Sequence, residues 1–388
     1  MKILFLTYYF EPDLCAGSFR NSSLFHALRD NLPKGSTLEV ITTHPNRYNS
    51  YIVDANDKKS FTKNVTVNRI RIPKHKSGLV GQVKSFIVFY LEVLKLVKDS
   101  DYDLVYASSS RLFTAFLGSV IARRKRTKLY LDIRDIFRES IVDVYGNSIM
   151  KFCLNTIIKP IENYTFSYAN HINLVSGGFA SYFTKYNKCE FSFYTNGIDD
   201  LFLNRKASST NINSIKSVVY AGNIGEGQGL HLILPILADL YKDSLKFIIY
   251  GDGGAKQKLL DSIQKMNIKN IEMNSPVSRD KLLNIYEDAD FLFLHLNKHL
   301  AFERVIPSKL FEYSAFDKPI IAGVSGYAKD FIEKNLSNYI LFPPGNTEIF
   351  ATHFKSYEYK NYFRNNFIQS FSRSSINKEM SFSILNLK

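Results

Sequence analysis

Short apolar runs alternate with longer segments of helical periodicity along most of this chain. In the first half, buried strands are indicated by the runs KILFLTY, LEVITT, DLVYASS, KLYLDIRD and HINLVS. The same rhythm restarts at KSVVYAGN and continues through KFIIYGDG, NIEMNS, DFLFLHL and KPIIAG. Because apolar strands that alternate with helices form parallel sheets covered on both faces, the pattern predicts an α/β fold.

The two series of strands are separated by a polar stretch, FYTNGIDDLFLNRKASSTNINSIK, whose Asn, Ser and Thr content is typical of a linker. We therefore predict a first domain over residues 1–205 and a second over residues 206–365, each a doubly wound, Rossmann-like domain. A chain of 388 residues is long enough for two separate cores. Residues 366–388 form a polar, partly helical tail that could return to pack on the first domain.

The chain is strongly basic, with 50 Lys and Arg against 36 Asp and Glu and a net charge of +14. Such a charge attracts nucleic acid, anionic lipid or phosphorylated substrates. We expect no nucleic-acid partner, because no helix-turn-helix, RNP-like or zinc pattern accompanies the charge. The three cysteines are widely spaced, which argues against a disulfide framework and a zinc site and fits a reducing compartment.

A basic segment, RIRIPKHKSG at residues 69–78, leads into the apolar segment LVGQVKSFIVFYLEVLKLVKDS. Lys84, Glu92 and Lys95 exclude a membrane span there. A basic helix with a wide apolar face can lie in the interface of an anionic membrane. The same pattern fits a core helix beneath a solvated basic loop, and the sequence leaves both interpretations open.

Residues 301–323, AFERVIPSKLFEYSAFDKPIIAG, contain the most specific pattern. Pro307 and Ser308 predict a helix start, followed by Lys309 and by Glu312 in the first turn. The free N–H groups and the helix dipole favour an anion at such a terminus. A phosphate would lie beside Lys309, and Glu312 could accept hydrogen bonds from a vicinal diol such as a ribose. A surface helix with an i,i+3 ion pair explains the spacing equally well.

The stretch YAGNIGEGQGL at 220–230 predicts a strand, a glycine-rich turn and a helix start. Gly222 and Gly225 allow a ligand to approach the backbone, whose amides would face phosphate, or they serve the turn geometry alone. The turn is also similar to a dinucleotide fingerprint, although its spacing is GxGxG, and Asp252 follows at the end of the next strand. A nicotinamide-dependent dehydrogenase is therefore a minor alternative.

Two further candidates follow strands in the first half. EPDLCAGSFR places Gly17 in a loop that opens onto a helix over 19–29, and LDIRDIFRES places Asp135 just past a strand end. Asp135 could orient a hydroxyl group or accept its proton; a plain βα loop and an ion-paired loop are the structural alternatives. The Asp-x-Asp pairs at 101–103 and 288–290 lead into strands, so we expect no metal site.

Taken together, these segments resemble the retaining glycosyltransferases of family 4, in particular bacterial enzymes of O-antigen and capsule assembly. The resemblance extends in order over nearly the whole chain and is carried by YYFEPDLCAGSFR, LDIRDIFRES, YTNGIDD, YAGNIGEGQGL, IIYGDGG, VIPSKLFEYSAFDKPIIAG and FPPGN. It implies the α/β GT-B fold, in which two Rossmann-like domains face each other across a cleft. The first domain would hold the acceptor and the second the nucleotide-sugar.

The resemblance also implies the reaction and its setting. A sugar would move from a nucleotide-sugar, most often a UDP-sugar, to a polyprenyl-diphosphate-linked glycan with retention of configuration. Neither a metal nor a cofactor would be required. The enzyme would be cytoplasmic and peripheral on the inner face of the cytoplasmic membrane, whose anionic surface attracts the basic first domain.

By the same resemblance, Glu312 would bind the ribose hydroxyls, Lys309 would hold the diphosphate and Asp135 would face the acceptor. Stabilisation of the leaving nucleoside diphosphate would be the main catalytic contribution. The implied donor-binding residues are Gly17, Gly222, Asn223, Gly225, Asp252, Val277, Arg304, Pro307 and Ser308.

Two departures from the family pattern affect the site. The family's E-x7-E pattern ends at the position of Glu312, but its first Glu is replaced by Arg304, with Glu303 one position away. Either Glu303 takes that role, or the contacts with the sugar differ. The Gly222 turn also lacks the usual basic residue, which would make Lys309 the principal cation. The first departure motivates another alternative, a catalytically silent nucleotide-sugar-binding partner of a polysaccharide assembly complex.

Overall fold

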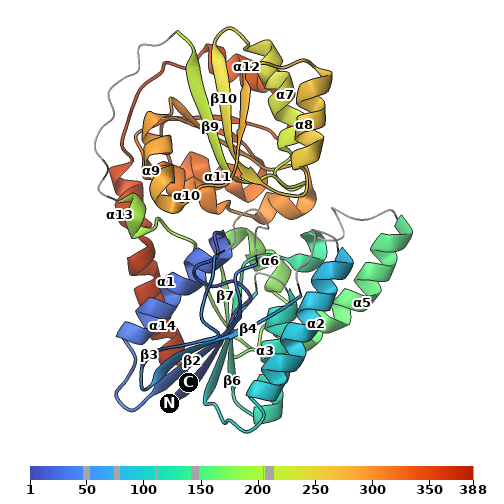
Figure 1. Ribbon diagram of the computed structural model, residues 1–388, viewed down its shortest axis with the longest axis vertical. Helices are drawn as coiled ribbons and strands as arrows, with labels where there is room; N and C mark the ends of the chain where they lie inside the picture. The colour runs from blue at the N-terminus through green and yellow to red at the C-terminus, as the bar shows by residue number, and fades with distance from the viewer. Residues whose placement is uncertain are drawn as a thin grey trace. The chain divides into compact units, whose positions relative to one another are not determined.

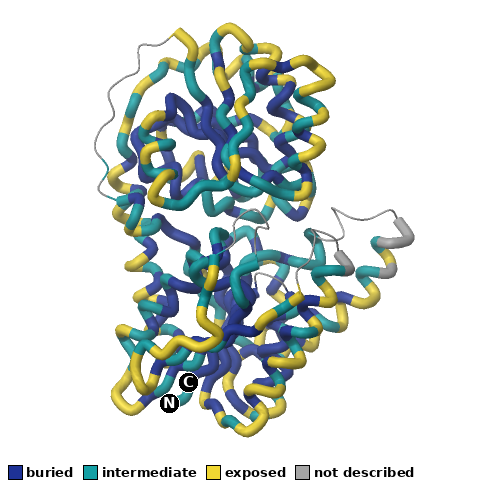
Figure 2. The backbone as a smooth tube through the Cα atoms, in the orientation of Figure 1, coloured by how far each residue is buried: buried dark blue, intermediate teal, exposed yellow. Residues whose placement is uncertain are grey.

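The computed structural model describes residues 1–46, 53–73, 79–109, 112–140, 148–203, 205 and 214–387. The chain forms two compact units (Figure 1). Unit 1 consists of Met1–Asn196 and Ser374–Lys388, and unit 2 consists of Gly197–Arg373. Each unit is an α/β structure built on one sheet, and in each the central strands are deeply buried (Figure 2).

Unit 1 contains an eight-stranded sheet in the order β3-β4-β2-β1-β5-β6-β7-β8. Among the described strand pairs, all are parallel except β3 with β4. The strands are β1 (Lys2–Leu6), β2 (Thr37–Thr43), β3 (Lys58–Thr62), β4 (Val65–Ile70), β5 (Leu104–Ser109), β6 (Lys128–Ile133), β7 (His171–Leu174) and β8 (Glu190–Ser192).

Helices cover both faces of this sheet (Figure 1). On one face, buried residues of α1 and α14 share a core with the strands, including Phe25 of α1 and Met380 of α14. On the other face α2 and α3 contact the sheet, and α5 packs on α3. These helices are α1 (Ala16–Asp30), α2 (Leu79–Leu96), α3 (Leu112–Lys125), α5 (Ser148–Phe166) and α14 (Arg373–Leu385), with a short α6 (Ala180–Phe183) after the 3-10 turn η1 (Gly177–Phe179).

Unit 2 contains a six-stranded sheet in the order β11-β10-β9-β12-β13-β14, and its described pairings are parallel. Numbered within the unit, this is the doubly wound order 3-2-1-4-5-6, which binds ligands where the strand order reverses. The strands are β9 (Lys216–Asn223), β10 (Leu245–Asp252), β11 (Ile271–Asn274), β12 (Phe291–His295), β13 (Ile320–Gly323) and β14 (Tyr339–Phe342).

Two hydrophobic clusters fill the two faces of this sheet. One is built with α7, α8 and α12, and the other with α9, α10, α11 and α13. The helices are α7 (Leu230–Leu240), α8 (Lys256–Lys265), α9 (Arg279–Asp288), α10 (Ser308–Ser314), α11 (Gly326–Asn335), α12 (Thr347–Lys355) and α13 (Asn365–Ser370), with 3-10 turns η2 (Asp200–Phe202) and η3 (Leu300–Arg304). The predicted fold class, two doubly wound Rossmann-like domains, is confirmed; their facing across a cleft stays a prediction.

The chain crosses between the units at positions that differ from the predicted boundaries of 205/206 and 365/366. The units divide after Asn196 and after Arg373. The physical reason is a short parallel contact within unit 2, where Ile198 N–H donates to the Phe371 carbonyl at 2.6 Å and Arg373 N–H donates to the Ile198 carbonyl at 2.7 Å. Arg373 also pairs with Asp199 at 2.7 Å. Residues 206–213, part of the predicted linker, lie outside the described residues.

Helix α2 packs on unit 1 as the core-helix interpretation expects, and its contact with a membrane stays a prediction. Phe89 and Val93 are buried, whereas Val83, Ile87 and Leu91 are exposed at 47%, 52% and 57%. One face therefore packs on unit 1 and another presents apolar side chains outward. In the part of the chain that the structure describes, a helix with the length and apolarity of a membrane span is not found.

Candidate functional site

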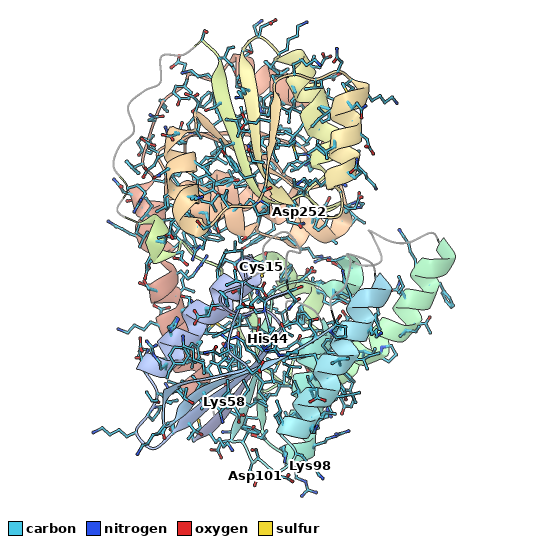
Figure 3. The ribbon with its side chains drawn as sticks, in the orientation of Figure 1. Cys15, His44, Lys58, Lys98, Asp101 and Asp252 are labelled. Carbon is cyan, nitrogen blue, oxygen red and sulfur yellow. The ribbon has the colours of Figure 1, made fainter. Side chains whose placement is uncertain are left out.

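The carboxyl ends of β9, β10 and β12 meet at one edge of the unit 2 sheet, where the strand order reverses. Asn223 ends β9 and is in register with Asp252, which ends β10 (labelled in Figure 3). The Ile224 N–H donates to the Asp252 carbonyl at 2.9 Å, which extends this pairing into the following turn. The structure thus brings together two predicted donor-binding residues at the edge where α/β sheets bind ligands.

The glycine-rich turn that follows β9 is held by side chains within it. Gly222 has φ of +148°, a conformation that other residues rarely adopt. The Tyr220 hydroxyl donates to the Asn223 carbonyl at 2.6 Å. The Asn223 amide donates to Gln228 Oε1 at 2.8 Å, and the same oxygen accepts from the Gly225 N–H at 3.2 Å. The turn is therefore organised before any ligand binds.

Helix α10 begins at Ser308, with Pro307 as an extended N-cap, so the predicted helix start is confirmed. Glu312 is the fifth residue of this helix. It therefore lies in the second turn, and its predicted place in the first turn is wrong, because Pro307 precedes the helix and the first turn starts with Ser308. Glu312 is 9% exposed. The neighbouring Tyr313 hydroxyl accepts from the Ala221 N–H at 3.4 Å, which ties α10 to β9.

Lys309 extends from the first turn of α10 over the glycine turn. Its Nζ lies 5.3 Å from the centroid of the Tyr220 ring. A Cβ atom built on Gly222 would collide with the Lys309 ammonium group. The cation, the glycine turn and the start of α10 therefore share one small region, which has the positive charge and backbone amides that a phosphate group requires.

His295, at the end of β12, connects two loops of this region and was missed from the sequence. Its Nδ1 lies 2.6 Å from the Gln228 carbonyl, and its Nε2 accepts from the Gly345 N–H at 3.0 Å. The ring is therefore a neutral tautomer with its proton on Nδ1. Burial lowers the pKa of His295 to about 4, which keeps the ring neutral at physiological pH. The sequence feature that could have indicated His295 is its position as the polar residue that ends the apolar run FLFLH.

The other predicted donor residues of unit 2 lie in two further segments. Glu303 and Arg304 belong to η3, where Glu303 is exposed and Arg304 is partly buried. Gly326, at the start of α11, lies against the Glu303 backbone. Val277 is partly buried in the loop between β11 and α9. The donor contacts assigned to these residues stay predictions.

In unit 1, Gly17 is the second residue of α1, so its predicted position in a loop before a helix at 19–29 is wrong. Helix α1 starts at Ala16 because Cys15 is an extended N-cap whose Sγ accepts from the Ser18 N–H at 3.5 Å. A Cβ on Gly17 would lie 2.9 Å from Arg134 Nη1, so the guanidinium of Arg134 covers this first helical turn. The role of Gly17 toward a donor held by unit 2 stays a prediction.

Asp135 follows β6 at the carboxyl edge of the unit 1 sheet, as predicted from LDIRDIFRES. Its Oδ1 accepts from the Ser140 hydroxyl at 2.6 Å. Burial raises the pKa of Asp135, which makes its carboxylate a better proton acceptor than an exposed one. Its role toward an acceptor stays a prediction.

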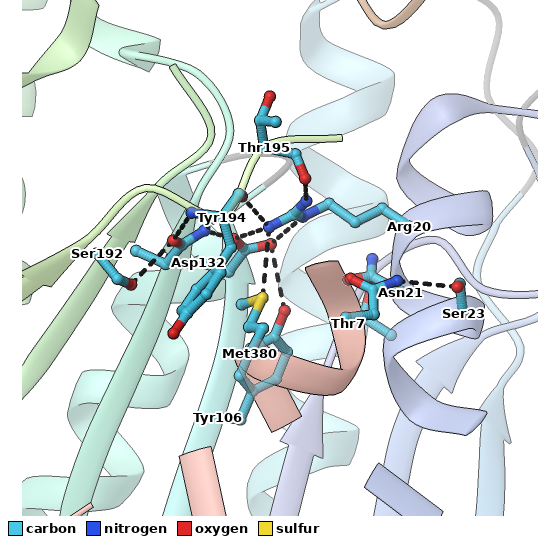
Figure 4. Close-up of polar contacts among 12 residues, drawn as sticks. Thr7, Arg20, Asn21, Ser23, Tyr106, Asp132, Ser192, Tyr194, Thr195 and Met380 are labelled. Atoms are coloured by element: carbon cyan, nitrogen blue, oxygen red, sulfur yellow. Dashed lines mark hydrogen bonds and ion pairs between the residues drawn. The ribbon is translucent and has the colours of Figure 1, made fainter. Parts of the chain in front are cut away.

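Beneath this edge lies a buried polar network (Figure 4). Arg20 of α1 forms a bidentate salt bridge with Asp132 of β6, with N···O distances of 2.8 and 2.9 Å. The same guanidinium donates to the Thr195 carbonyl at 2.7 Å. Tyr106 and Asn173 also donate to Asp132, at 3.2 and 2.7 Å. The proximity of Arg20 holds the pKa of Asp132 below its usual range despite the cost of burial. This network fixes β6, which ends two residues before Asp135.

Within the described residues, no three His, Cys, Asp or Glu side chains gather in a way that could hold a metal ion. The aspartates before β5 and β12 have structural partners instead. Asp103 accepts from the Lys2 N–H at 2.7 Å, and Asp290 from the Ser217 N–H at 2.8 Å. Metal independence of any reaction stays a prediction.

Comparison with known proteins gives this site a context. Residues 204–372, nearly the whole of unit 2, match the family model "Glycosyl transferases group 1". A segment of 95 residues is 35% identical to WcaI of Escherichia coli (strain K12), which is named as a colanic acid biosynthesis glycosyl transferase. That segment spans 24% of this chain and 23% of WcaI, so the chain matches about a quarter of this curated relative.

Several solved structures share the fold over almost the full chain. Anabaena Alr3699/HepE in complex with UDP-glucose has a TM-score of 0.65 at 15% identity, and 99% of each chain is covered. WaaG, a glycosyltransferase involved in lipopolysaccharide biosynthesis, has a TM-score of 0.64 at 13% identity, covering 99% of this chain and 100% of WaaG. Unit 2 therefore matches the group 1 glycosyl transferase model, and the chain as a whole shares the fold of these solved structures.

Proposed function

We propose that this protein is a retaining glycosyltransferase that moves a hexosyl or N-acetylhexosaminyl group from a UDP-sugar to a lipid-linked glycan in surface polysaccharide assembly. The observation that carries the proposal is the position of Lys309 over the Gly222 turn, in the unit that matches the group 1 model. A cation at this position would stabilise the negative charge that develops on a leaving nucleoside diphosphate. Glu312, buried about one helical turn further on, would accept hydrogen bonds from the ribose hydroxyls.

The proposal extends to the place of action. The acceptor would be a polyprenyl-diphosphate-linked glycan, and the enzyme would act in the cytoplasm on the inner face of the cytoplasmic membrane. Unit 1 contains 29 Lys and Arg and 17 Asp and Glu, so it carries +12 of the chain's net charge of +14. This concentration of positive charge supports attraction to an anionic lipid surface.

The first test is a thermal-shift screen of the purified protein with UDP, GDP, ADP, CMP and NAD(P). A ligand at a hundred times its Kd stabilises the native state by about 2.7 kcal/mol and raises the melting temperature by several degrees. We expect a response to UDP that disappears in Glu312→Gln and persists in Glu333→Gln, a surface variant on α11. A response only to NAD(P) would instead favour the dehydrogenase alternative.

The second test measures transfer. Lys309→Ala should lower kcat about 100-fold, the usual cost of removing one group that stabilises developing negative charge. Lys265→Ala, at an exposed position on α8, should leave it unchanged. A Lys309→Ala enzyme that keeps most of its kcat would refute this role. UDP binding without sugar transfer or donor hydrolysis would favour the catalytically silent partner, as the replacement of the family's first Glu by Arg304 suggests.

A further inference from the structure

Three successive carbonyl groups of the glycine turn are held by residues at the end of β12 and just after it. The Gln228 carbonyl accepts from His295 Nδ1 at 2.6 Å, and the Gly227 carbonyl accepts from the Asn297 N–H at 2.8 Å. The Glu226 carbonyl accepts from the Asn297 side-chain amide at 2.9 Å. These three oxygens therefore point toward residues 295–297, which are distant in sequence from the turn.

The chain after β12 also packs closely against the turn. A Cβ atom built on Gly229 would lie 3.0 Å from Asn297 Cγ, and one built on Gly227 would lie 2.7 Å from Cζ of Phe302 in η3. Because glycine has no side chain, the Phe302 ring can lie directly on the backbone of the turn. The turn and the residues after β12 are therefore packed as one structure.

His295 is itself fixed in position. The residue is 2% exposed, and its ring lies parallel to that of Phe293, with the centroids 6.3 Å apart. The Phe342 ring lies 6.2 Å away, and Nε2 accepts from the Gly345 N–H at 3.0 Å. A neutral imidazole has one donor and one acceptor, and both are used here. The Nδ1 proton is therefore aimed at the Gln228 carbonyl.

The direction of these carbonyl groups matters to an anion. A phosphate is attracted by the N–H end of a peptide group and repelled by its carbonyl oxygen. Peptide groups beside glycine can reverse their direction at low cost, because glycine adopts φ angles of either sign. A carbonyl oxygen that accepts a hydrogen bond from a fixed donor is held against such a reversal, so it does not turn toward a phosphate.

Gln228 connects His295 to the part of the turn near Gly222. Its Oε1 accepts from the Asn223 amide at 2.8 Å and from the Gly225 N–H at 3.2 Å, while its carbonyl accepts from His295. A displaced Gln228 would therefore lose its hold on both residues, and Asn223 is next to Gly222 in the chain.

We propose that His295 and Asn297 are positioning residues of the donor site, which keep the carbonyl groups of the glycine turn from facing the diphosphate. The inference rests on the proposed function, which places a diphosphate beside Lys309 and this turn. Both residues act through the turn and need not touch the donor. Their removal should therefore weaken the binding of the diphosphate and leave the binding of the nucleoside unchanged.

The test compares UDP with uridine, which lacks the diphosphate, in ligand-observed NMR titrations of the full-length protein. We expect the wild type to prefer UDP, and His295→Phe to lower this preference about tenfold, the effect of losing a hydrogen bond to a buried carbonyl. His295→Gln keeps one donor and one acceptor and should recover most of the preference. An equal loss of affinity for UDP and uridine would indicate a merely structural role and would overturn the proposal.

A second variant covers the case in which His295→Phe does not fold. Asn297→Leu keeps the approximate size of the side chain but removes the donor to the Glu226 carbonyl, so it should also lower the preference for UDP. Its matched control is Asn270→Leu. The Asn270 amide donates to the Ala238 and Leu245 carbonyls at 2.9 and 2.8 Å, and Leu245 starts β10 at the opposite edge of the same sheet.

Asn270→Leu should lose stability and keep the wild-type preference for UDP. An equal drop in preference in Asn270→Leu and Asn297→Leu would overturn the positioning role. If His295→Phe and Asn297→Leu both keep the wild-type preference, that role is wrong and the glycosyltransferase stands. If both lose it while the wild type transfers no sugar, the positioning role stands and the transferase is wrong. A wild type that binds uridine as tightly as UDP would remove both.

Discussion

At the scale of single residues, the glycine turn and Lys309 depend on each other. Gly222 has φ of +148°, which residues other than glycine rarely adopt. Any other residue would also place its Cβ against the Lys309 side chain. Alanine there would strain the backbone and displace the ammonium group. Gly35 offers a comparison, because its φ is +79° but open space surrounds its Cα.

We therefore predict that Gly222→Ala weakens UDP binding at least tenfold and destabilises the protein by about 1–3 kcal/mol, the usual cost of a residue held in a sparsely populated backbone region. Gly35→Ala should lose stability through its φ angle alone and bind UDP normally. Calorimetric titration with UDP and urea unfolding measure the two effects. Equal UDP affinities in the two variants would show that the turn does not form the diphosphate site.

His295 makes stability depend on pH. Its pKa falls from an unfolded value of about 6.5 to about 4, so the unfolded chain binds the proton more readily. The stability linked to His295 is therefore complete above pH 6.5 and is lost as the pH falls toward 4. A shift of this size corresponds to about 3 kcal/mol.

We predict that the free energy of unfolding falls less steeply between pH 7 and pH 4.5 in His295→Gln than in the wild type. Glutamine retains one donor and one acceptor but does not titrate. In the wild type, the imidazole NMR signal of His295 should stay unshifted down to about pH 5. A midpoint near 6.5 would contradict the neutral bridge between the Gln228 carbonyl and the Gly345 N–H.

At the scale of elements, the apolar runs predicted ten of the described strands and missed four, of which β4 (VTVNRI) and β14 (YILF) are largely buried. The ten apolar runs correspond to strands of the two sheets. Strand β3 (KKSFT) was missed because its exposed edge carries polar side chains that do not differ from those of a loop. The edge strand β8 (EFS) was missed because three residues are too few to show an alternation of apolar and polar positions.

Site residues that lie close together in the sequence could be predicted from their spacing. Site residues that come together only through folding could not. Lys309 and Glu312 are on one short helix, so their spacing sufficed. The bridge made by His295 depends on two loops 117 residues apart, Gln228 and Gly345, and no local pattern records it.

Helix α1 and strand β6 are joined by the buried Arg20–Asp132 pair. Asp132→Asn should destabilise unit 1 by about 3–5 kcal/mol, because it leaves the Arg20 charge buried without its partner. Glu272→Gln, which removes the exposed Lys246–Glu272 pair of unit 2, should cost less than about 1 kcal/mol. Urea unfolding followed by circular dichroism compares the two variants. If both variants lose less than about 1 kcal/mol of stability, the carbonyl groups that accept from Arg20 are enough to stabilise its buried charge.

At the scale of the whole molecule, charge is distributed unequally, with +12 on unit 1 and +2 on unit 2. We predict that the protein cosediments with vesicles containing an anionic phospholipid and not with vesicles of phosphatidylcholine alone. Raising the salt concentration from 0.05 to about 0.5 M should release most of it, because ions screen exposed charges. Binding that is insensitive to both lipid charge and salt would contradict the electrostatic attraction.

The return of α14 to unit 1 has a consequence for how the protein is made. Met380 and Ile384 complete the core around β1 and α1, yet they are translated after all of unit 2. Domains commonly fold in order as they leave the ribosome. Here unit 2 is complete in sequence while unit 1 still lacks its final helix, so a nascent chain interrupted before residue 374 would present an open core to chaperones and proteases.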